Sequence, residues 1–496
     1  MPGDPGDDRG EGAIVTEPSV PETFNLADIW EAAVDRCSDR LAVVAGDRRL
    51  TYAELEERAN RLAHVLLDRG VRPGQHIGLY LENGSEYLEG MLAAYKVRAV
   101  PINVNFRYVE HELRHLFDDA DLVGVIDHRR FAPRVTAIDA DLPDLHWYLS
   151  VDDGSGESIE AFDGVDYEAA LAASDPHRDF PSRSSDDKYV IYTGGTTGFP
   201  KGVVWSHQNA FYACIGGGDP MRLHGPVEKP HELVERMIDG TFLFLPVAPL
   251  MHAAAQWTSL SWLFSGGAVV LMPGALDPRA VWETVEREKV NLLVIVGDAV
   301  ARPLVDEWRE SGPYDTSSLF SVGSGGAPLT PKLKDELVDI VSPAQVNDGF
   351  GSSETGAQGT QRLQGGEKSG GVTRFTPFGD TTVVLDEATL EPVTPGSDEV
   401  GRVAMRGHIP REYYNDPEKT AQTFVEHAGH RWVLTGDMAR VESDGTIQLL
   451  GRGSVCINTG GEKVFPEEVE AVLKEHPDVY DELGRGGRRS RGGASA

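Results

Sequence analysis

Cysteine is scarce in this chain. Its three cysteines, Cys37, Cys214 and Cys456, are far apart, and no pair has C-x-x-C spacing. An odd, scattered set excludes a disulfide framework and a zinc site built from paired cysteines. It also fits a reducing compartment, so we expect a cytoplasmic protein.

Long apolar runs are absent as well. No stretch reaches the roughly 18 apolar residues that a membrane-spanning helix requires. The first residues are acidic and rich in Gly and Pro. They lack the basic segment and apolar run of a secretory signal. We expect residues 1–22 to form a disordered tail.

Positive charge is in deficit, with 46 Lys and Arg against 79 Asp and Glu and a net charge of −33. Such a surface repels nucleic-acid phosphates and anionic lipid, which excludes both as partners. The acidity can serve solubility alone. An anionic substrate would need a locally positive site.

Helix and strand signals alternate along the first three quarters of the chain. Thr51 begins a capping box with Glu54, and apolar residues then recur at helical spacing. Short strands are predicted at 76–81 and 122–126, with a helix at 85–99 between them. The fold class is therefore α/β, with helix-covered, mainly parallel sheets. After residue 378, short strands between Gly, Pro and Asp turns predict a β-rich subdomain over about 378–450.

A glycine-rich loop at Tyr192–Gly202 is the strongest chemical signal. Glycines let backbone N–H groups converge on phosphate oxygens, while Thr193, Thr196, Thr197 and Lys201 add hydroxyls and a cation. The apolar run at 189–192 predicts a strand, so the loop would follow a strand end, where α/β folds bind nucleotides. The pattern is not a Walker A loop. The alternative is a glycine-rich turn without a ligand.

Six motifs in order make the chain resemble the adenylate-forming superfamily of acyl-CoA synthetases, adenylation domains and luciferases. The segment from Thr193 to Lys201 matches that family's AMP-binding signature at each position. The other motifs are Pro249–His252, Gly323–Pro328, Gly349–Gly356, Thr435–Asp437 and Gly451–Arg452. The resemblance implies a large AMP-binding domain over 23–450, a hinge over 451–455 and a small C-terminal α+β domain.

The resemblance also assigns site residues. Thr193, Lys201, His252 and Glu354 are implied as catalytic residues, and Thr197 and Glu354 as Mg²⁺ ligands. The implied nucleotide-binding residues are Thr193, Gly194, Gly195, Thr196, Thr197, Gly198, Lys201, Gly325, Gly326, Ala327, Asp348, Gly349, Phe350, Gly351, Ser353, Asp437 and Arg452.

Each assignment has a physical rationale and an ordinary alternative. Phe350 offers a flat face for adenine. Glu354 is a hard oxygen ligand beside phosphates, or else a solvated carboxylate. Asp437, in an expected T-G-D turn, could accept the ribose hydroxyls or cap the backbone. Arg452 could complement ribose or phosphate oxygens, or form a surface ion pair. His252 could orient a carboxylate or be structural.

The implied reaction joins a carboxylic acid to coenzyme A in two steps. The acid and MgATP give an acyl-adenylate and pyrophosphate, and the thiol of coenzyme A then gives a thioester and AMP. The motifs resemble those of actinobacterial ligases for fatty acids or steroid side-chain acids. Two alternatives stay open, an enzyme that loads a carrier protein and a non-catalytic adenylate- or acyl-binding protein. A homodimer also stays open.

The C-terminal residues depart from the family pattern. We expect a truncated C-terminal domain over 456–483 and a disordered Arg/Gly tail over 484–496. No residue matches the family lysine that contacts the acid and α-phosphate, so we expect slow adenylation. A frameshifted or prematurely ended reading frame would explain the tail. The alternative is a divergent tail that binds an acidic partner.

Overall fold

The computed structural model describes residues 21–194 and 199–452, the strand residues 457–458 and 463–464, and residues 469 and 473. The predicted tails, most of the hinge and most of the C-terminal domain lie outside these residues. Within the described part, no helix is both long and apolar enough to cross a membrane.

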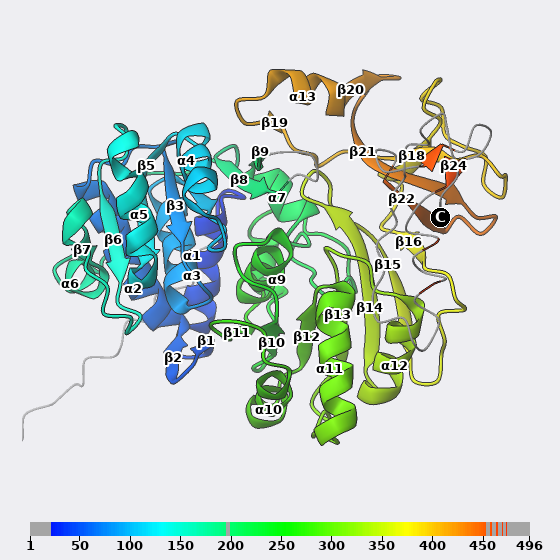
Figure 1. Cartoon of the computed structure of the whole chain (residues 1–496), viewed down its shortest axis with the longest axis horizontal. Coiled ribbons are helices and arrows are strands. Elements are labelled where there is room, and N and C mark those ends of the chain that lie inside the picture. Colours follow the sequence, from blue (N-terminus) through cyan, green and yellow to red (C-terminus); the bar gives the residue numbers. More distant parts are fainter. Residues whose placement is uncertain are drawn as a thin grey trace, which may run out of the picture.

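A five-stranded parallel sheet forms the first unit, drawn in blue and cyan at the left of Figure 1. The capping box predicted at Thr51 is present at the start of α2. Helices α1, α2 and α3 contact one another, and α2 and α3 also contact β1 of the neighbouring sheet. The strands, in spatial order, are β4 (Val100–Asn103), β3 (His76–Tyr80), β5 (Leu122–His128), β6 (Tyr148–Val151) and β7 (Val165–Asp166). The helices are α1 (Leu26–Cys37), α2 (Tyr52–Asp68), α3 (Ser85–Lys96), α4 (Glu110–Asp119), α5 (Ala132–Ile138) and α6 (Tyr167–Ala172).

The larger sheet contains fourteen strands, and six consecutive strands of it are parallel. Its buried strands are rich in Val, Leu and Ile, as expected where helices cover both faces. The six are β1 (Leu41–Ala45), β11 (Ala268–Leu271), β10 (Leu243–Pro246), β12 (Leu292–Ile295), β13 (Ser321–Ser324) and β14 (Gln345–Ser352). Helices α10 (Pro278–Glu288), α11 (Gly297–Ser311) and α12 (Pro331–Val341) connect the strands on one side. The α/β class is thus confirmed.

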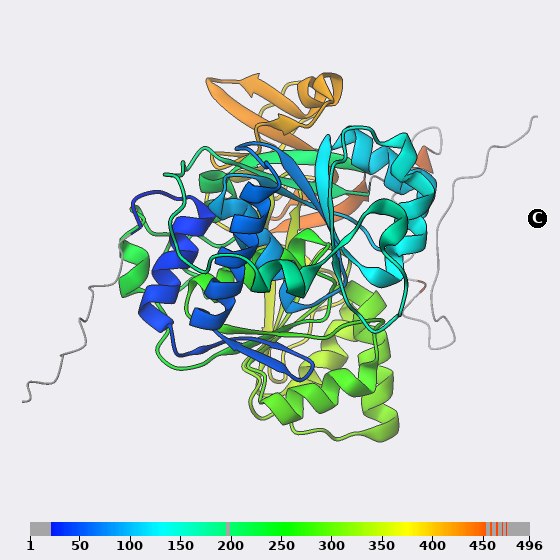
Figure 2. The same cartoon turned by 90° about the vertical axis from the view of Figure 1, so that its left-hand side faces the viewer.

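Beyond β14 the pairing becomes antiparallel, in the yellow to orange part of Figure 1. The short strands predicted after residue 378 are present, and they continue the large sheet through β15 and β16. Figure 2 shows α13 (Pro417–Thr423) and the β20–β21 hairpin projecting at the top of the molecule. The strands are β15 (Gly356–Gln364), β16 (Arg374–Pro377), β17 (Thr382–Leu385), β18 (Gly401–Arg406), β20 (Phe424–His427), β21 (His430–Val441) and β22 (Ile447–Arg452).

A small antiparallel sheet lies between these units. It joins β8 (Lys188–Thr193), β9 (Lys201–Ser206) and β19 (Glu412–Tyr413). The strand predicted at 189–192 is confirmed, and its side chains are buried. Thr193 pairs with Lys201, so the glycine-rich loop closes a hairpin. The loop follows the end of β8, as expected, and leads into β9, which returns antiparallel alongside β8.

Candidate active site

Several chain segments meet where the parallel strands of the large sheet end. The Gly325 N–H donates to Ile295 O over 3.3 Å, and the Val247 N–H donates to Val294 O over 2.9 Å. Ser324 and Asp348 are register partners on β13 and β14. The predicted adenine-side segment that begins at Gly325 therefore passes beside the predicted residue Gly349. Ligands in open α/β sheets bind at this kind of edge.

Strand β14 turns two different faces to its surroundings. Asp348 and Phe350 are buried, whereas Gly349 and Gly351 are exposed. The ring of Phe350 is 8% exposed and lies 5.4 Å from the ring of Phe375, within a cluster of apolar side chains. This position differs from the predicted stacking on adenine. Side chains alternate along a strand, so the open face of β14 carries glycine backbone and no aromatic ring.

Asp348, predicted to bind the nucleotide, takes part in a buried ion pair. Its Oδ2 lies 2.8 Å from Nζ of Lys334 on α12, and both side chains are less than 5% exposed. Lys334 also donates to Thr373 Oγ1 over 3.0 Å and to Gln361. Burial raises the pKa of Asp348, and the Lys334 charge opposes that shift. The Asp348 carboxylate thus links the buried face of β14 to α12.

Glu354 follows β14 in the turn toward β15. Its Oε1 accepts a hydrogen bond of 2.8 Å from the Tyr413 hydroxyl. Trp205 Nε1 on β9 donates to Ser353 O over 3.1 Å, and Tyr413 pairs with Val203 of β9. Burial and the nearby Glu354 charge raise the pKa of Tyr413. Strand β9, which begins at the lysine of the glycine-rich loop, is therefore also fastened to the turn that carries Glu354.

The two ends of the glycine-rich loop are described. Lys201 forms an ion pair with Asp416, and that contact lowers the pKa of Asp416. The ring of Phe199 lies against the ring of His115 of α4 in a tilted arrangement, with centroids 4.1 Å apart. Gly194 is exposed. The predicted phosphate-binding residues within the loop, Gly195, Thr196, Thr197 and Gly198, lie outside the described residues.

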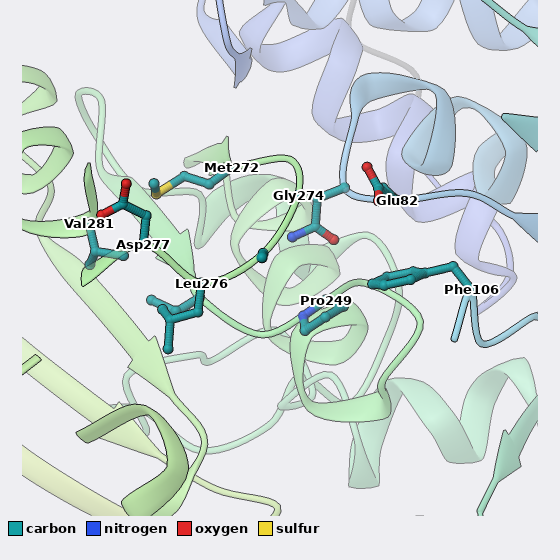
Figure 3. A pocket seen from close by; sticks show the side chains of 11 residues that line it. Glu82, Phe106, Pro249, Met272, Gly274, Leu276, Asp277 and Val281 are labelled. Atoms are coloured by element: carbon teal, nitrogen blue, oxygen red, sulfur yellow. The ribbon is translucent and has the colours of Figure 1, made fainter. Parts of the chain in front are cut away.

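His252 lies at the start of α9 (Ala253–Phe264), at the same edge. Its side chain reaches solvent, yet surrounding protein atoms displace enough water to lower the pKa of the imidazole, and the Arg107 charge adds to this shift. A small hollow opens next to Pro249. Figure 3 shows Glu82 and Phe106 reaching it from loops of the five-stranded sheet, opposite Met272 and Leu276.

Asp437 and Arg452 are register partners on β21 and β22, which brings the two predicted ribose-side residues together. The turn predicted at Thr435–Asp437 is wrong, because β21 runs through it from His430 to Val441. The Asp437 N–H donates to Thr435 Oγ1 over 3.2 Å, so the local hydrogen bond that suggested a turn forms inside a strand. The side chain of Arg452 lies outside the described residues.

Three site residues were not predicted from the sequence, namely Lys334, Tyr413 and Asp416. The sequence carries no motif around any of them. Their contacts link positions 14, 59 and 215 residues apart, which only the fold brings together.

The site suits Mg²⁺ bound together with a polyphosphate. No group of three or more His, Cys, Asp or Glu side chains converges among the described residues. Mg²⁺ requires no such cluster, because it takes one or two carboxylates and completes its shell with phosphate oxygens and water. Glu354 would supply the carboxylate.

Comparisons with known proteins agree with this arrangement. Residues 30–414 match the family model of the AMP-binding enzymes. A 3-oxocholest-4-en-26-oate–CoA ligase of Rhodococcus rhodochrous is 44% identical over 93% of this chain and 83% of its own length. The medium-chain acyl-CoA ligase Mig of Mycobacterium avium is 42% identical over 92% of this chain and 85% of its own.

The fold also matches solved structures. The anthranilate CoA ligase AuaEII in complex with anthranoyl-AMP superposes with a TM-score of 0.78 at 23% identity, over 93% of this chain and 84% of that one. The ATP-bound MatB of Rhodopseudomonas palustris superposes with a TM-score of 0.76 at 24% identity, over 92% and 84%. These likenesses concern the fold. The match of the family model and the identity to full-length relatives show that the chain belongs to the AMP-binding enzyme family.

Proposed function

We propose that the protein is an acyl-CoA synthetase that activates a fatty acid or a steroid side-chain acid with ATP. One observation carries the proposal: the strand that begins at Lys201 is linked directly to Glu354. Strand β9 pairs with β19, where the Tyr413 hydroxyl donates to Glu354, and Trp205 of β9 donates to Ser353 O. A cation and a hard carboxylate thus lie on linked elements near the carboxyl ends of the parallel strands. The substrate class is inferred from relatives named for 3-oxocholest-4-en-26-oate and for medium- and long-chain fatty acids.

In the first proposed step, a carboxylate oxygen of the acid attacks the α-phosphorus of ATP and pyrophosphate leaves. Lys201 and the backbone of the glycine-rich loop would hold phosphate oxygens, while Glu354 would hold Mg²⁺, which would neutralise charge on those oxygens. His252, at the same edge, orients the acid. Gly349 and Gly351 let the nucleotide approach β14, while Asp437 and Arg452 hold the ribose. In the second step the thiol of coenzyme A attacks the acyl carbon, and AMP and a proton leave.

A screen of carboxylic acids tests the proposal. Fatty acids of graded length and cholestenoic-type acids are incubated with ATP, Mg²⁺ and coenzyme A, and AMP and acyl-CoA are quantified by mass spectrometry. We expect AMP and acyl-CoA in equal amounts with at least one acid. Transfer only to a phosphopantetheine carrier would favour a carrier-loading enzyme. Adenylate binding without pyrophosphate exchange would favour the non-catalytic alternative.

Glu354→Gln tests the role of the carboxylate. We expect ATP–pyrophosphate exchange to fall about 100-fold, because the amide is a poor ligand for Mg²⁺. Tyr413→Phe is the matched control, since it removes only the hydrogen bond to Glu354 and should cost about 10-fold or less. Equal losses would contradict a metal-binding role for Glu354. The wild-type rate of ATP–pyrophosphate exchange tests the slow adenylation expected from the sequence. Light scattering tests whether the protein is a homodimer.

A further inference from the structure

Two buried asparagines from the five-stranded sheet hold the backbone around the predicted catalytic histidine. Asn103, at the end of β4, is 6% exposed, and Asn83, after β3, is 9% exposed. Both lie at the carboxyl edge of their sheet, facing the segment 247–252. Each uses its side-chain amide on backbone groups that belong to other parts of the chain.

Asn103 joins the two predicted halves of the reaction centre. Its Oδ1 accepts the Tyr192 N–H over 2.8 Å, and its Nδ2 donates to Tyr192 O over 2.8 Å. The same Nδ2 donates to Met251 O over 2.8 Å. Tyr192 directly precedes Thr193 at the start of the glycine-rich loop, and Met251 directly precedes His252. One side chain therefore fixes the distance between the phosphate side and the acid side.

Asn83 also forms hydrogen bonds to backbone groups, but among the described residues only to the segment that leads to His252. Its Oδ1 accepts the Leu250 N–H over 2.7 Å, and its Nδ2 donates to Ala248 O over 3.4 Å. It thus holds the segment that leads to His252, and within the described part of the chain its side chain forms no hydrogen bond to β8. Asn83 is a matched control, of the same residue type and similar burial, with partners on one side of the site.

We propose that Asn103 is a positioning residue for acyl-adenylate formation. It sets the register between the nucleotide held by the glycine-rich loop and the carboxylate held near His252. This inference rests on the proposed function. An amide suits the task, because its two donors and one acceptor match two carbonyls and one N–H, a set that aspartate or leucine cannot satisfy. The reacting atoms must meet at about 3–3.5 Å, so a small slip of one side against the other slows the chemical step.

Asn103→Ala and Asn83→Ala, assayed side by side for ATP–pyrophosphate exchange, test the role. For Asn103→Ala we expect kcat to fall roughly 30- to 100-fold while the KM for ATP and for the acid each change less than about 3-fold. For Asn83→Ala we expect mainly a higher KM for the acid. Similar KM and kcat patterns in the two variants would overturn the proposal, because a general loss of packing affects both alike.

A double-mutant cycle with His252→Ala sharpens the result. If Asn103 acts by placing His252 against the nucleotide, the double variant loses little more than the worse single variant. Multiplied losses would overturn the proposal. Asn103→Ser is assayed in the same way, so that a folding defect of the alanine variant does not decide the matter.

Hydrogen exchange gives a readout that needs no turnover. In the wild type, a non-hydrolysable ATP analogue should slow amide exchange in the peptide covering 248–256. Asn103→Ala should abolish that response and Asn83→Ala should retain it, whereas a response retained in both would overturn the proposal. If no acid supports ATP–pyrophosphate exchange in the wild type, the proposed function fails. The hydrogen-exchange experiment alone then decides whether Asn103 couples the glycine-rich loop to the segment that carries His252.

Discussion

The two sheets each bury one carboxylate toward the carboxyl end of a strand, and the two carboxylates have opposite surroundings. Asp348 on β14 lies 2.8 Å from the Lys334 ammonium. Asp127 on β5 is fully buried, accepts one hydrogen bond of 2.9 Å from Ser150, and has no hydrogen-bond partner at Oδ2 among the described residues. The charged pair lies beneath the candidate site, whereas burial raises the pKa of Asp127 to about 8 and keeps it largely protonated at neutral pH. Burial alone therefore does not determine whether a carboxylate here is charged.

Asp127→Asn should produce the largest change in the pH dependence of stability. The pKa of Asp127 in the folded protein lies above the ordinary value of 3.8, so the folded state binds more protons and the wild type loses stability as pH rises from about 4 to 8. Relative to the wild type, we expect the variant to gain about 5 kcal/mol across that range. Urea unfolding at several pH values measures the difference. The exposed Asp144→Asn is the control, and equal slopes for Asp127→Asn and wild type would contradict the prediction.

Lys334→Met removes the cation of the buried Lys334–Asp348 ion pair. Removing the ammonium leaves the buried Asp348 without its cation, so the free energy of unfolding should fall by about 4 kcal/mol. Lys332→Met, two residues earlier on the same helix and less buried, should have little effect. A double variant, Lys334→Met with Asp348→Leu, should recover most of the stability because it removes both charges. No recovery would show that the pair itself is net stabilising.

His207 extends the comparison to a buried base. It is 1% exposed, its Nδ1 accepts the Leu26 N–H over 3.0 Å, and burial lowers its pKa to about 4. The unfolded chain takes up a proton near pH 6.5, so the folded protein should lose about 3 kcal/mol as pH falls from 6.5 to 4. His207→Asn retains an acceptor and should remove this loss, which urea unfolding would detect. A variant as acid-sensitive as the wild type would contradict the prediction.

Local patterns predicted much of the fold from the sequence. The capping box at Thr51 and the apolar run at 189–192 encode their elements within a few residues, and both predictions are confirmed. The direction of the Phe350 side chain was harder to predict, because the sequence Gly349-Phe-Gly351 does not indicate which face of β14 packs against the core. The Thr435–Asp437 segment suggested a turn, but it lies within β21, and Asp437 pairs with Arg452 of β22.

The supports of the candidate site could not be predicted from the sequence. Asn103 contacts residues 89 and 148 positions away, and Lys201 meets Asp416 across 215 positions. In the sequence, an asparagine at the end of a short apolar segment suggests an ordinary turn residue. Such contacts depend on how two sheets pack, which periodicity within one element does not specify.

Because the glycine-rich loop closes a β-hairpin, the positive charge available to a bound phosphate comes from side chains rather than from a helix N-terminus. Many phosphate-binding loops lead directly into a helix and use the partial positive charge of its N-terminus. Here the loop returns into β9, and the next helix, α7 (His207–Ala213), begins only after that strand ends. The segment that follows the loop therefore directs no helix N-terminus at it. Capture of a polyanion by a chain of net charge −33 therefore requires Lys201 to exchange its Asp416 partner for a phosphate oxygen.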